Sequence, residues 1–150
     1  MSRSLPPILV CYDGSPGAAR AVDAAGTLFP GRRAIVLNVW PGVSAERVRT
    51  TSVEGVRDEL VEEVRVAARR EAAAVADEGT SLARRAGLEA EPLTVETRER
   101  VPDAIVRVAT KESAAAVVIG RPTRARLGSL LPGSVSRSVV DHCPMPTVVV

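Results

Sequence analysis

Residues 117–142 read VVIGRPTRARLGSLLPGSVSRSVVDH, a stretch in which a short apolar run gives way to a helical pattern. The apolar run ends at Gly120, and a helix is predicted from about Val135 to His142. Three arginines and no acidic residue lie in the loop between Gly120 and Gly133. Strands that alternate with helices build parallel sheets covered by helices on both faces. The stretch therefore predicts an α/β fold.

The rest of the chain repeats this alternation. With the run just described, five apolar runs of strand type lie at residues 7–12, 34–40, 90–97, 115–119 and 147–150. Helical spacing of apolar residues predicts helices from Pro16 to the break at Pro30, from about Val53 to Arg85, from Val101 onward and from Val135 to His142. The order β-α-β-α-β-α-β-α-β predicts one doubly wound, Rossmann-like domain, residues 1–150, with a five-stranded parallel sheet.

Composition limits the function classes. The net charge is +2 with 25% charged residues, which argues against a strongly basic nucleic-acid-binding protein. No apolar run approaches the ~20 residues that a membrane span needs, so we expect no membrane partner. The chain has two cysteines and one histidine, which offer no metal-ligand cluster. We expect Cys11 and Cys143 to be buried free thiols in a reducing cytoplasm, with a disulfide between them as the alternative.

Two loops carry the candidate binding residues. In an open parallel sheet, ligands bind beyond the carboxyl ends of the strands where the winding reverses. Asp13, Gly14 and Ser15 follow the first strand, and a long loop from Gly120 to Ser136 follows the fourth. If these two strands are neighbours, both loops meet at one place. A plain helix-entry role with a local turn bond is the alternative for Asp13.

The longer loop has the features of an anion site. Gly120 and Gly133 would let the backbone approach a ligand closely. The first turn of the following helix exposes unpaired N–H groups with a partial positive charge. Hydroxyls at Ser134 and Ser136 would add donors, and the arginines Arg121, Arg124 and Arg126 would add positive charge. In the alternative interpretation, Ser134 is only a helix cap and the arginines are only solvated.

The sequence resembles the universal stress protein family along nearly its whole length. The segments ILVCYDGS (residues 8–15) and AIVLNVW (34–40) are similar to the first two strands of that family. Its nucleotide-binding members carry Gly, two residues, Gly, nine residues, and then Gly-Ser or Gly-Thr. Here Gly120, Thr123 and Gly133-Ser134 fill those places. The resemblance implies the strand order 3-2-1-4-5.

The resemblance also implies a role for each matching residue. Asp13 would contact the adenosine, and backbone groups at Cys11, Tyr12 and Val39 would frame the adenine. Gly120 and Arg121 would lie beside the ribose and phosphates. The phosphates would be held at the helix start by Gly133, Ser134, Val135 and Ser136. Thr123 departs from the motif: its Cβ would crowd the phosphates if the position needs a positive φ, whereas its hydroxyl would add a contact.

Three functions follow as hypotheses. The first is a stress-response regulatory protein that binds ATP or another adenine nucleotide, with or without Mg²⁺. The second is a slow ATPase, although no nucleophile–base pair is evident and His142 has no predicted catalytic role. The third, favoured by Thr123, is a nucleotide-independent scaffold. The last apolar run, PTVVV, is short and is predicted to form an edge strand, which favours a homodimer through this strand. The resemblance also implies this pairing. The identity of a regulatory partner does not follow from the sequence.

Overall fold

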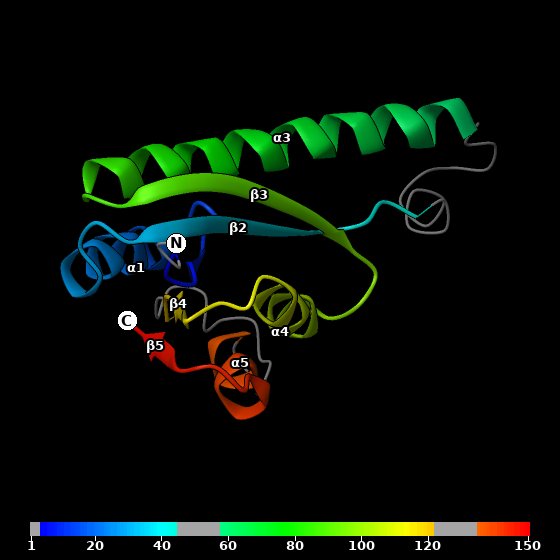
Figure 1. Cartoon of the computed structure of the whole chain (residues 1–150). Coiled ribbons are helices and arrows are strands. Elements are labelled where there is room, and N and C mark those ends of the chain that lie inside the picture. The colour runs from blue at the N-terminus through cyan, green and yellow to red at the C-terminus, as the bar shows by residue number, and fades with distance from the viewer. Residues whose placement is uncertain (1–3, 45–57, 122–134) are drawn as a thin grey trace.

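One parallel sheet forms the centre of the computed structural model, which describes residues 4–44, 58–121 and 135–150 (Figure 1). The strand order is β3-β2-β1-β4-β5, as expected from the resemblance. All neighbouring strands are parallel. The strands are β1 (Ile8–Cys11), β2 (Arg33–Pro41), β3 (Glu89–Thr97), β4 (Ala116–Ile119) and β5 (Thr147–Val149).

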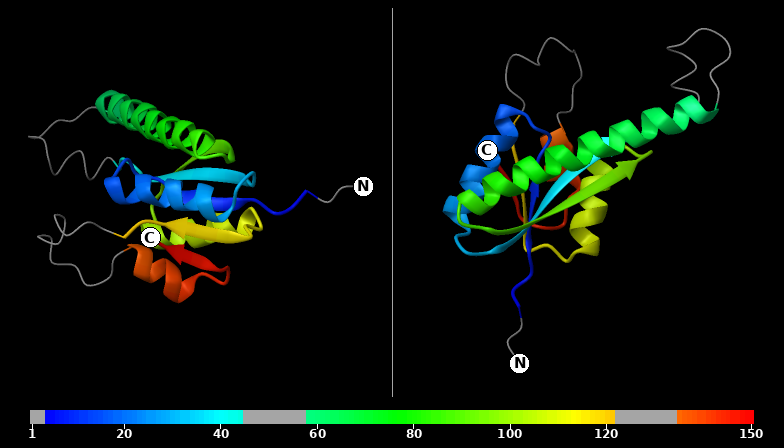
Figure 2. Two further views of the ribbon diagram at one scale, coloured as in Figure 1. Left: turned by 90° about the vertical axis from the view of Figure 1, so that its left-hand side faces the viewer. Right: turned by 90° about the horizontal axis from the view of Figure 1, so that it is seen from above.

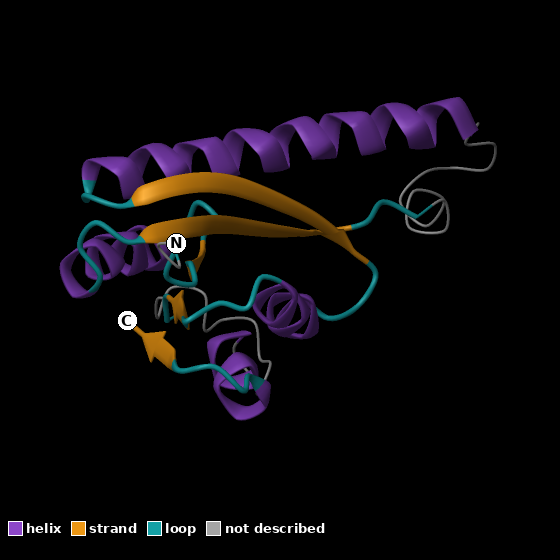
Figure 3. Cartoon of the chain, viewed as in Figure 1, coloured by secondary structure: helices purple, strands orange, loops and turns teal. Residues whose placement is uncertain are grey.

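Helices cover both faces of this sheet, as Figures 1 and 3 show. One face packs against α1 and α3, and the other packs against α4 and α5. The two further views in Figure 2 show the same layers. The bounds are α1 (Pro16–Leu28), α3 (Asp58–Arg85), α4 (Val101–Lys111) and α5 (Val135–His142). The predicted start of the second helix, residues 53–57, lies outside the described residues. No helix in the described part of the chain is long and apolar enough to cross a membrane.

The central strand β1 explains why the sequence shows a continuous apolar run rather than an alternating one. Ile8 and Val10 point into the core on the α1/α3 face, whereas Leu9 and Cys11 point into the core on the α4/α5 face. Leu9 and Val10 are fully buried. A strand that is covered on both faces needs apolar residues at every position.

Local signals fix the start of α1 and the end of α3. The Ser15 hydroxyl caps α1 by accepting a hydrogen bond of 3.1 Å from the amide of Ala18, and Pro16 occupies the first turn. At the end of α3, Gly87 has a φ of +91°, and the amide of Leu88 donates to the carbonyl of Ala83. This is the left-handed helix stop that glycine favours. A serine just before the first turn of a helix and a glycine just after its last turn are the sequence signals of such caps.

The two edge strands of the sheet are β3 and β5. Pro92 lies within β3, which is an edge strand, where the amide donor that proline lacks is tolerated. The last apolar run forms β5 at the opposite edge. Because β1 and β4 are neighbours, the loops that follow them leave the sheet at the same edge, which we call the carboxyl edge.

Candidate functional site

The turn after β1 holds Asp13 in a fixed position. The amide of Ser15 donates a hydrogen bond of 2.9 Å to Oδ1 of Asp13, and Gly14 between them has a φ of +81°. A glycine at position 14 makes this left-handed turn possible without strain. Asp13 therefore makes the local turn bond that was considered as the alternative, and its side chain is exposed at the carboxyl edge.

Tyr12 anchors the same turn to the interior. Its amide donates to the carbonyl of Leu37 at 2.9 Å, and its carbonyl accepts from Nδ2 of Asn38 at 3.0 Å. Its ring is buried, and its hydroxyl donates to Oε1 of Glu78 on α3 at 2.6 Å. Burial and then the Glu78 bond raise the pKa of Tyr12 to about 12. The buried Asn38 thus has a structural role, since it holds the carbonyl of Tyr12 at the start of this turn.

Gly79 explains how α3 passes over this ring. A Cβ at position 79 would lie 2.5 Å from Cδ1 of Tyr12, closer than side chains approach one another. The helix continues unbroken through this glycine from Asp58 to Arg85. The glycine therefore makes room for the Tyr12 ring without interrupting the helix.

The two cysteines differ in exposure and are both free thiols. Cys11 is buried, whereas Cys143 is half-buried rather than buried, because it lies just beyond the end of α5. Burial, with smaller contributions from Cys143 and Asp13, raises the pKa of the Cys11 thiol to about 12. Because the folded-state pKa lies above the ordinary 9.0, Cys11 lowers the free energy of unfolding as the pH rises from about 9 to about 12.

This difference predicts selective alkylation. Iodoacetamide at pH 8 should modify Cys143 in the folded protein and leave Cys11 unmodified, because the thiolate is the reactive species and Cys11 stays protonated and shielded. Intact-mass spectrometry should show one adduct before denaturation and two after unfolding in urea. Equal modification of both cysteines in the folded protein would contradict the buried position of Cys11.

The end of β4 packs backbone to backbone against α1. A Cβ at Gly120 would collide with the backbone of Gly17, and a Cβ at Gly17 would lie 2.5 Å from the carbonyl oxygen of Arg121. On its other side, the amide of Arg121 donates to the carbonyl of Val150 at 2.8 Å. Gly120 was expected to let a ligand approach. The structure gives a further reason for this glycine, which is the close passage of α1.

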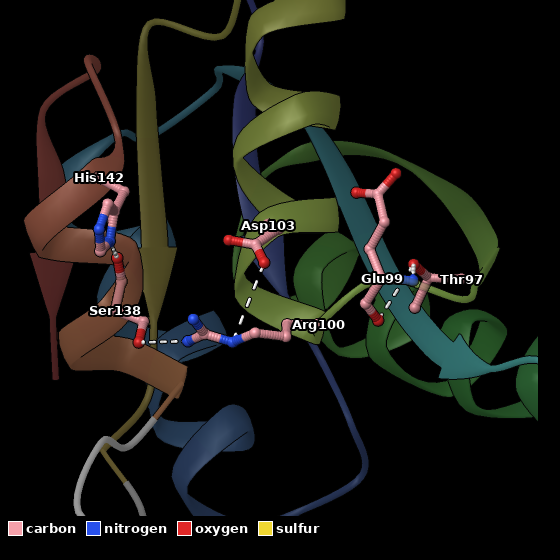
Figure 4. Close-up of polar contacts among 6 residues, drawn as sticks. All are labelled: Thr97, Glu99, Arg100, Asp103, Ser138 and His142. Carbon is pink, nitrogen blue, oxygen red and sulfur yellow. Dashed lines mark hydrogen bonds and ion pairs between the residues drawn. The ribbon is translucent and has the colours of Figure 1, made fainter.

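The start of α5 is held beside the start of α4, as Figure 4 shows. Nη2 of Arg100 donates to the hydroxyl of Ser138 at 3.1 Å, while Nε of Arg100 lies 3.9 Å from Asp103. Further along α5, Nδ1 of His142 lies 2.8 Å from the Ser138 carbonyl. Because α4 follows the carboxyl end of β3, these contacts hold the first turn of α5 toward the carboxyl edge.

The two described residues at the start of α5 differ in exposure. Val135 is 38% exposed, whereas Ser136 is only 5% exposed. The predicted phosphate contact of Ser136 would therefore have to come from a mostly buried residue. Backbone amides in the first turn of a helix are the usual donors at anion sites.

The structure thus brings together most of the predicted residues. At the carboxyl edge of three adjacent strands lie Cys11, Tyr12, Asp13, Val39, Gly120 and Arg121, and the first turn of α5 supplies Val135 and Ser136. Three further predicted residues, Thr123, Gly133 and Ser134, lie outside the described residues, together with Arg124 and Arg126. Gly17 was not predicted as a site residue, because its only signal in the sequence is a glycine in the first turn of a helix, where no positive φ is needed.

Residues 5–150 match the family described as the universal stress protein family. The chain belongs to this family. Since the match covers nearly the whole chain, the variant motif around Thr123 is a variation within the family.

Solved structures of universal stress proteins share the whole fold. A universal stress protein from Archaeoglobus fulgidus is 26% identical, with a TM-score of 0.69 over 97% of this chain and 98% of that chain. The Archaeoglobus fulgidus protein in complex with dAMP is 25% identical, with a TM-score of 0.65 and the same coverage. A universal stress protein in complex with cAMP is 21% identical, with a TM-score of 0.63 over 98% of this chain and 97% of that chain. No match was found among curated proteins.

Within residues 4–44, 58–121 and 135–150, no group of three or more His, Cys, Asp or Glu residues could hold a metal ion. Asp13 is the acidic residue that this universal stress protein places in the turn after β1. Near it at the carboxyl edge lies the exposed Arg121, which follows β4.

Proposed function

We propose that this universal stress protein binds an adenine nucleotide at the carboxyl edge, between the ends of β1 and β4. The observation that carries the proposal is the adjacency of the Asp13 turn and the Gly120–Arg121 turn on neighbouring strands. In the order β3-β2-β1-β4-β5, the winding reverses between β1 and β4. Ligands of open α/β sheets bind at this kind of reversal.

The charges and donors at this edge support a phosphate-bearing ligand. Arg121 is exposed there, and the first turns of α1 and α5 direct helix N-termini toward the same edge. Helix N-termini favour anions through unpaired N–H groups and the helix dipole. Asp13 is suited to accept hydrogen bonds from ribose hydroxyls, since an ionised carboxylate is an acceptor only. The adenosine would therefore lie toward β1 and β2, and the phosphates toward β4 and α5.

The family comparisons support adenine as the base. The Archaeoglobus fulgidus protein, 25% identical over 97% of this chain, binds dAMP, and another universal stress protein of this fold binds cAMP. We propose ATP as the ligand of this chain, with AMP as the alternative. Because the described residues offer no metal cluster of their own, Mg²⁺ would arrive on the phosphates of ATP.

Isothermal titration calorimetry tests the proposal. AMP, cAMP and ATP, the last with and without Mg²⁺, should each be titrated, with GMP and inorganic phosphate as comparison ligands. We expect saturable binding of at least one adenine nucleotide and weaker binding of GMP. If no adenine nucleotide gives saturable heat at millimolar concentration, the proposal fails and the scaffold function is favoured. Thr123→Gly should then be titrated to see whether a glycine at this position restores binding.

The proposed biological role is regulatory and cytoplasmic. The nucleotide would select a state of the protein that an unidentified regulatory partner recognises during stress. A thermodynamic link of this kind requires different nucleotide affinities in the free and the partner-bound protein. The two free thiols support a reducing compartment.

We propose a homodimer that pairs through β5. This strand is an edge of the sheet, and Val148 and Val149 on it are only half-buried. An apolar edge strand with unpaired backbone groups favours pairing with another strand. Replacing Val149 with lysine should therefore give a monomer in light scattering, because the charge would be buried in the interface. A folded V149K protein with an unchanged dimeric mass would exclude this interface.

A further inference from the structure

We infer that Gly17 is a positioning residue: the absence of a side chain at this position sets where Gly120 and Arg121 lie relative to Asp13, and thereby sets the affinity for the nucleotide. The inference rests on the proposed nucleotide-binding function. It concerns a residue outside the glycine motif of the loop, on a different helix.

The backbones of Gly17 and Arg121 lie in close contact. Gly17 lies in the first turn of α1, where its missing Cβ faces the carbonyl oxygen of Arg121. An added Cβ would lie 2.5 Å from that oxygen, whereas real Cβ contacts stay above 3.0 Å. The two backbone segments would therefore have to separate by at least about half an ångström. The obstacle is backbone on both sides, so no side-chain rotation can relieve it.

The turn formed by Gly120 and Arg121 has little freedom to move away from α1. The amide of Arg121 donates to the carbonyl of Val150 at 2.8 Å, and the amide of Val150 donates to the carbonyl of Ile119 at 3.0 Å. The turn after β4 therefore lies between α1 on one side and the end of β5 on the other. Moving it away from α1 pushes it toward the end of β5 and distorts this pair of hydrogen bonds.

Gly17 is linked to Asp13 through the cap of α1. Only the cap of α1 separates the two residues, and Ser15 joins them by donating its amide to Asp13 and accepting from Ala18. The turn after β1 and the first turn of α1 therefore form one hydrogen-bonded unit. A side chain at position 17 would change the spacing between this unit and the turn after β4. A ligand that contacts both turns requires that spacing to stay unchanged.

Gly26 offers a matched control on the same helix. A Cβ at this position would collide with the carbonyl oxygen of Ala86 and lie 2.7 Å from the Cβ of Ala86. The collision is again with backbone and is at least as severe. It lies near the other end of α1, away from the carboxyl edge. Gly17→Ala and Gly26→Ala therefore share the chemical change and differ in location.

Calorimetric titration with AMP compares the two variants at a temperature at which both are folded. We expect Gly17→Ala to weaken AMP binding about tenfold or more and Gly26→Ala to change it less than about twofold. Both variants should lower the melting temperature. Equal AMP affinities in the two variants would overturn the inference. If the unsubstituted protein binds neither AMP nor the other adenine nucleotides, the proposed function fails instead.

Hydrogen exchange of the Arg121 amide, read by NMR, tests the positioning without any nucleotide. This amide should exchange faster in Gly17→Ala than in Gly26→Ala, because its bond to Val150 is strained only in the first variant. Equal exchange would overturn the positioning step. If Gly17→Ala does not fold, the unsubstituted protein still decides: AMP should slow exchange at Arg121 and leave exchange at Ala86 unchanged. No change at Arg121 would overturn the inference.

Discussion

Leu9→Ala should lower the free energy of unfolding by about 2–5 kcal/mol, which is the usual cost of a cavity in a well-packed core. Leu9 is fully buried on the central strand β1, which has a paired strand on each side. Its side chain packs into the core beneath α4 and α5, together with Ile105 and Val139. Truncation removes contacts on an element that cannot move to fill the space, so the loss should lie toward the upper end of the range.

Urea denaturation followed by tryptophan fluorescence measures this loss. Trp40 is the sole tryptophan and is 9% exposed, so its emission should report unfolding. Leu5→Ala is the matched control, because Leu5 is 64% exposed and its truncation should change stability by no more than about 0.5 kcal/mol. Similar midpoints for the two variants would contradict the assignment of β1 to the centre of the sheet.

Asp13→Ala should weaken adenine-nucleotide binding by about 10–100-fold, because a hydrogen bond to a charged group contributes about 1.5–3 kcal/mol. Two effects combine at this residue. The substitution removes the proposed contact with the adenosine, and it also removes the acceptor that holds the Ser15 amide and thus the turn. Asp13→Asn separates the two effects, since an asparagine side chain can still accept the turn bond but carries no charge.

Asp23→Ala is the control for the change in net charge. Asp23 is exposed on the same helix α1 that follows the turn, away from the carboxyl edge. Its replacement should leave the affinity within about twofold of the unsubstituted protein, because exposed charges at a distance are screened by salt. If Asp13→Ala and Asp23→Ala bind the nucleotide equally well, Asp13 is not part of the site.

The sequence predicted the local structure well because local signals decide it. The Ser15 cap, the Gly87 stop and the five apolar runs each depend on a few neighbouring residues, and all are present. The strand order is a long-range property. Periodicity alone left it open, and the family resemblance supplied it correctly.

The tertiary contacts of the site could not be predicted from the sequence, because they join residues that lie far apart along the chain. A buried asparagine such as Asn38 needs a hydrogen-bond partner, but the identity of that partner, the Tyr12 carbonyl, depends on the register between β1 and β2. Gly120 was interpreted as room for a ligand, whereas its nearest neighbour is Gly17, about a hundred residues earlier in the sequence. The contribution of Thr123 stays a prediction, since it lies outside the described residues.

NMR mapping of AMP binding on the ¹⁵N-labelled protein locates the nucleotide on the fold. If AMP binds between β1 and β4, amide signals should shift at the carboxyl edge, at Asp13, Val39, Gly120, Arg121 and Ser136. Gly31 and Gly87 lie at the amino ends of β2 and β3, opposite the carboxyl edge, and their backbones are joined by a hydrogen bond of 3.0 Å. Their amide signals should not shift. Shifts that cluster around Gly31 and Gly87, or no shifts at saturating AMP, would contradict an adenine-nucleotide site between β1 and β4.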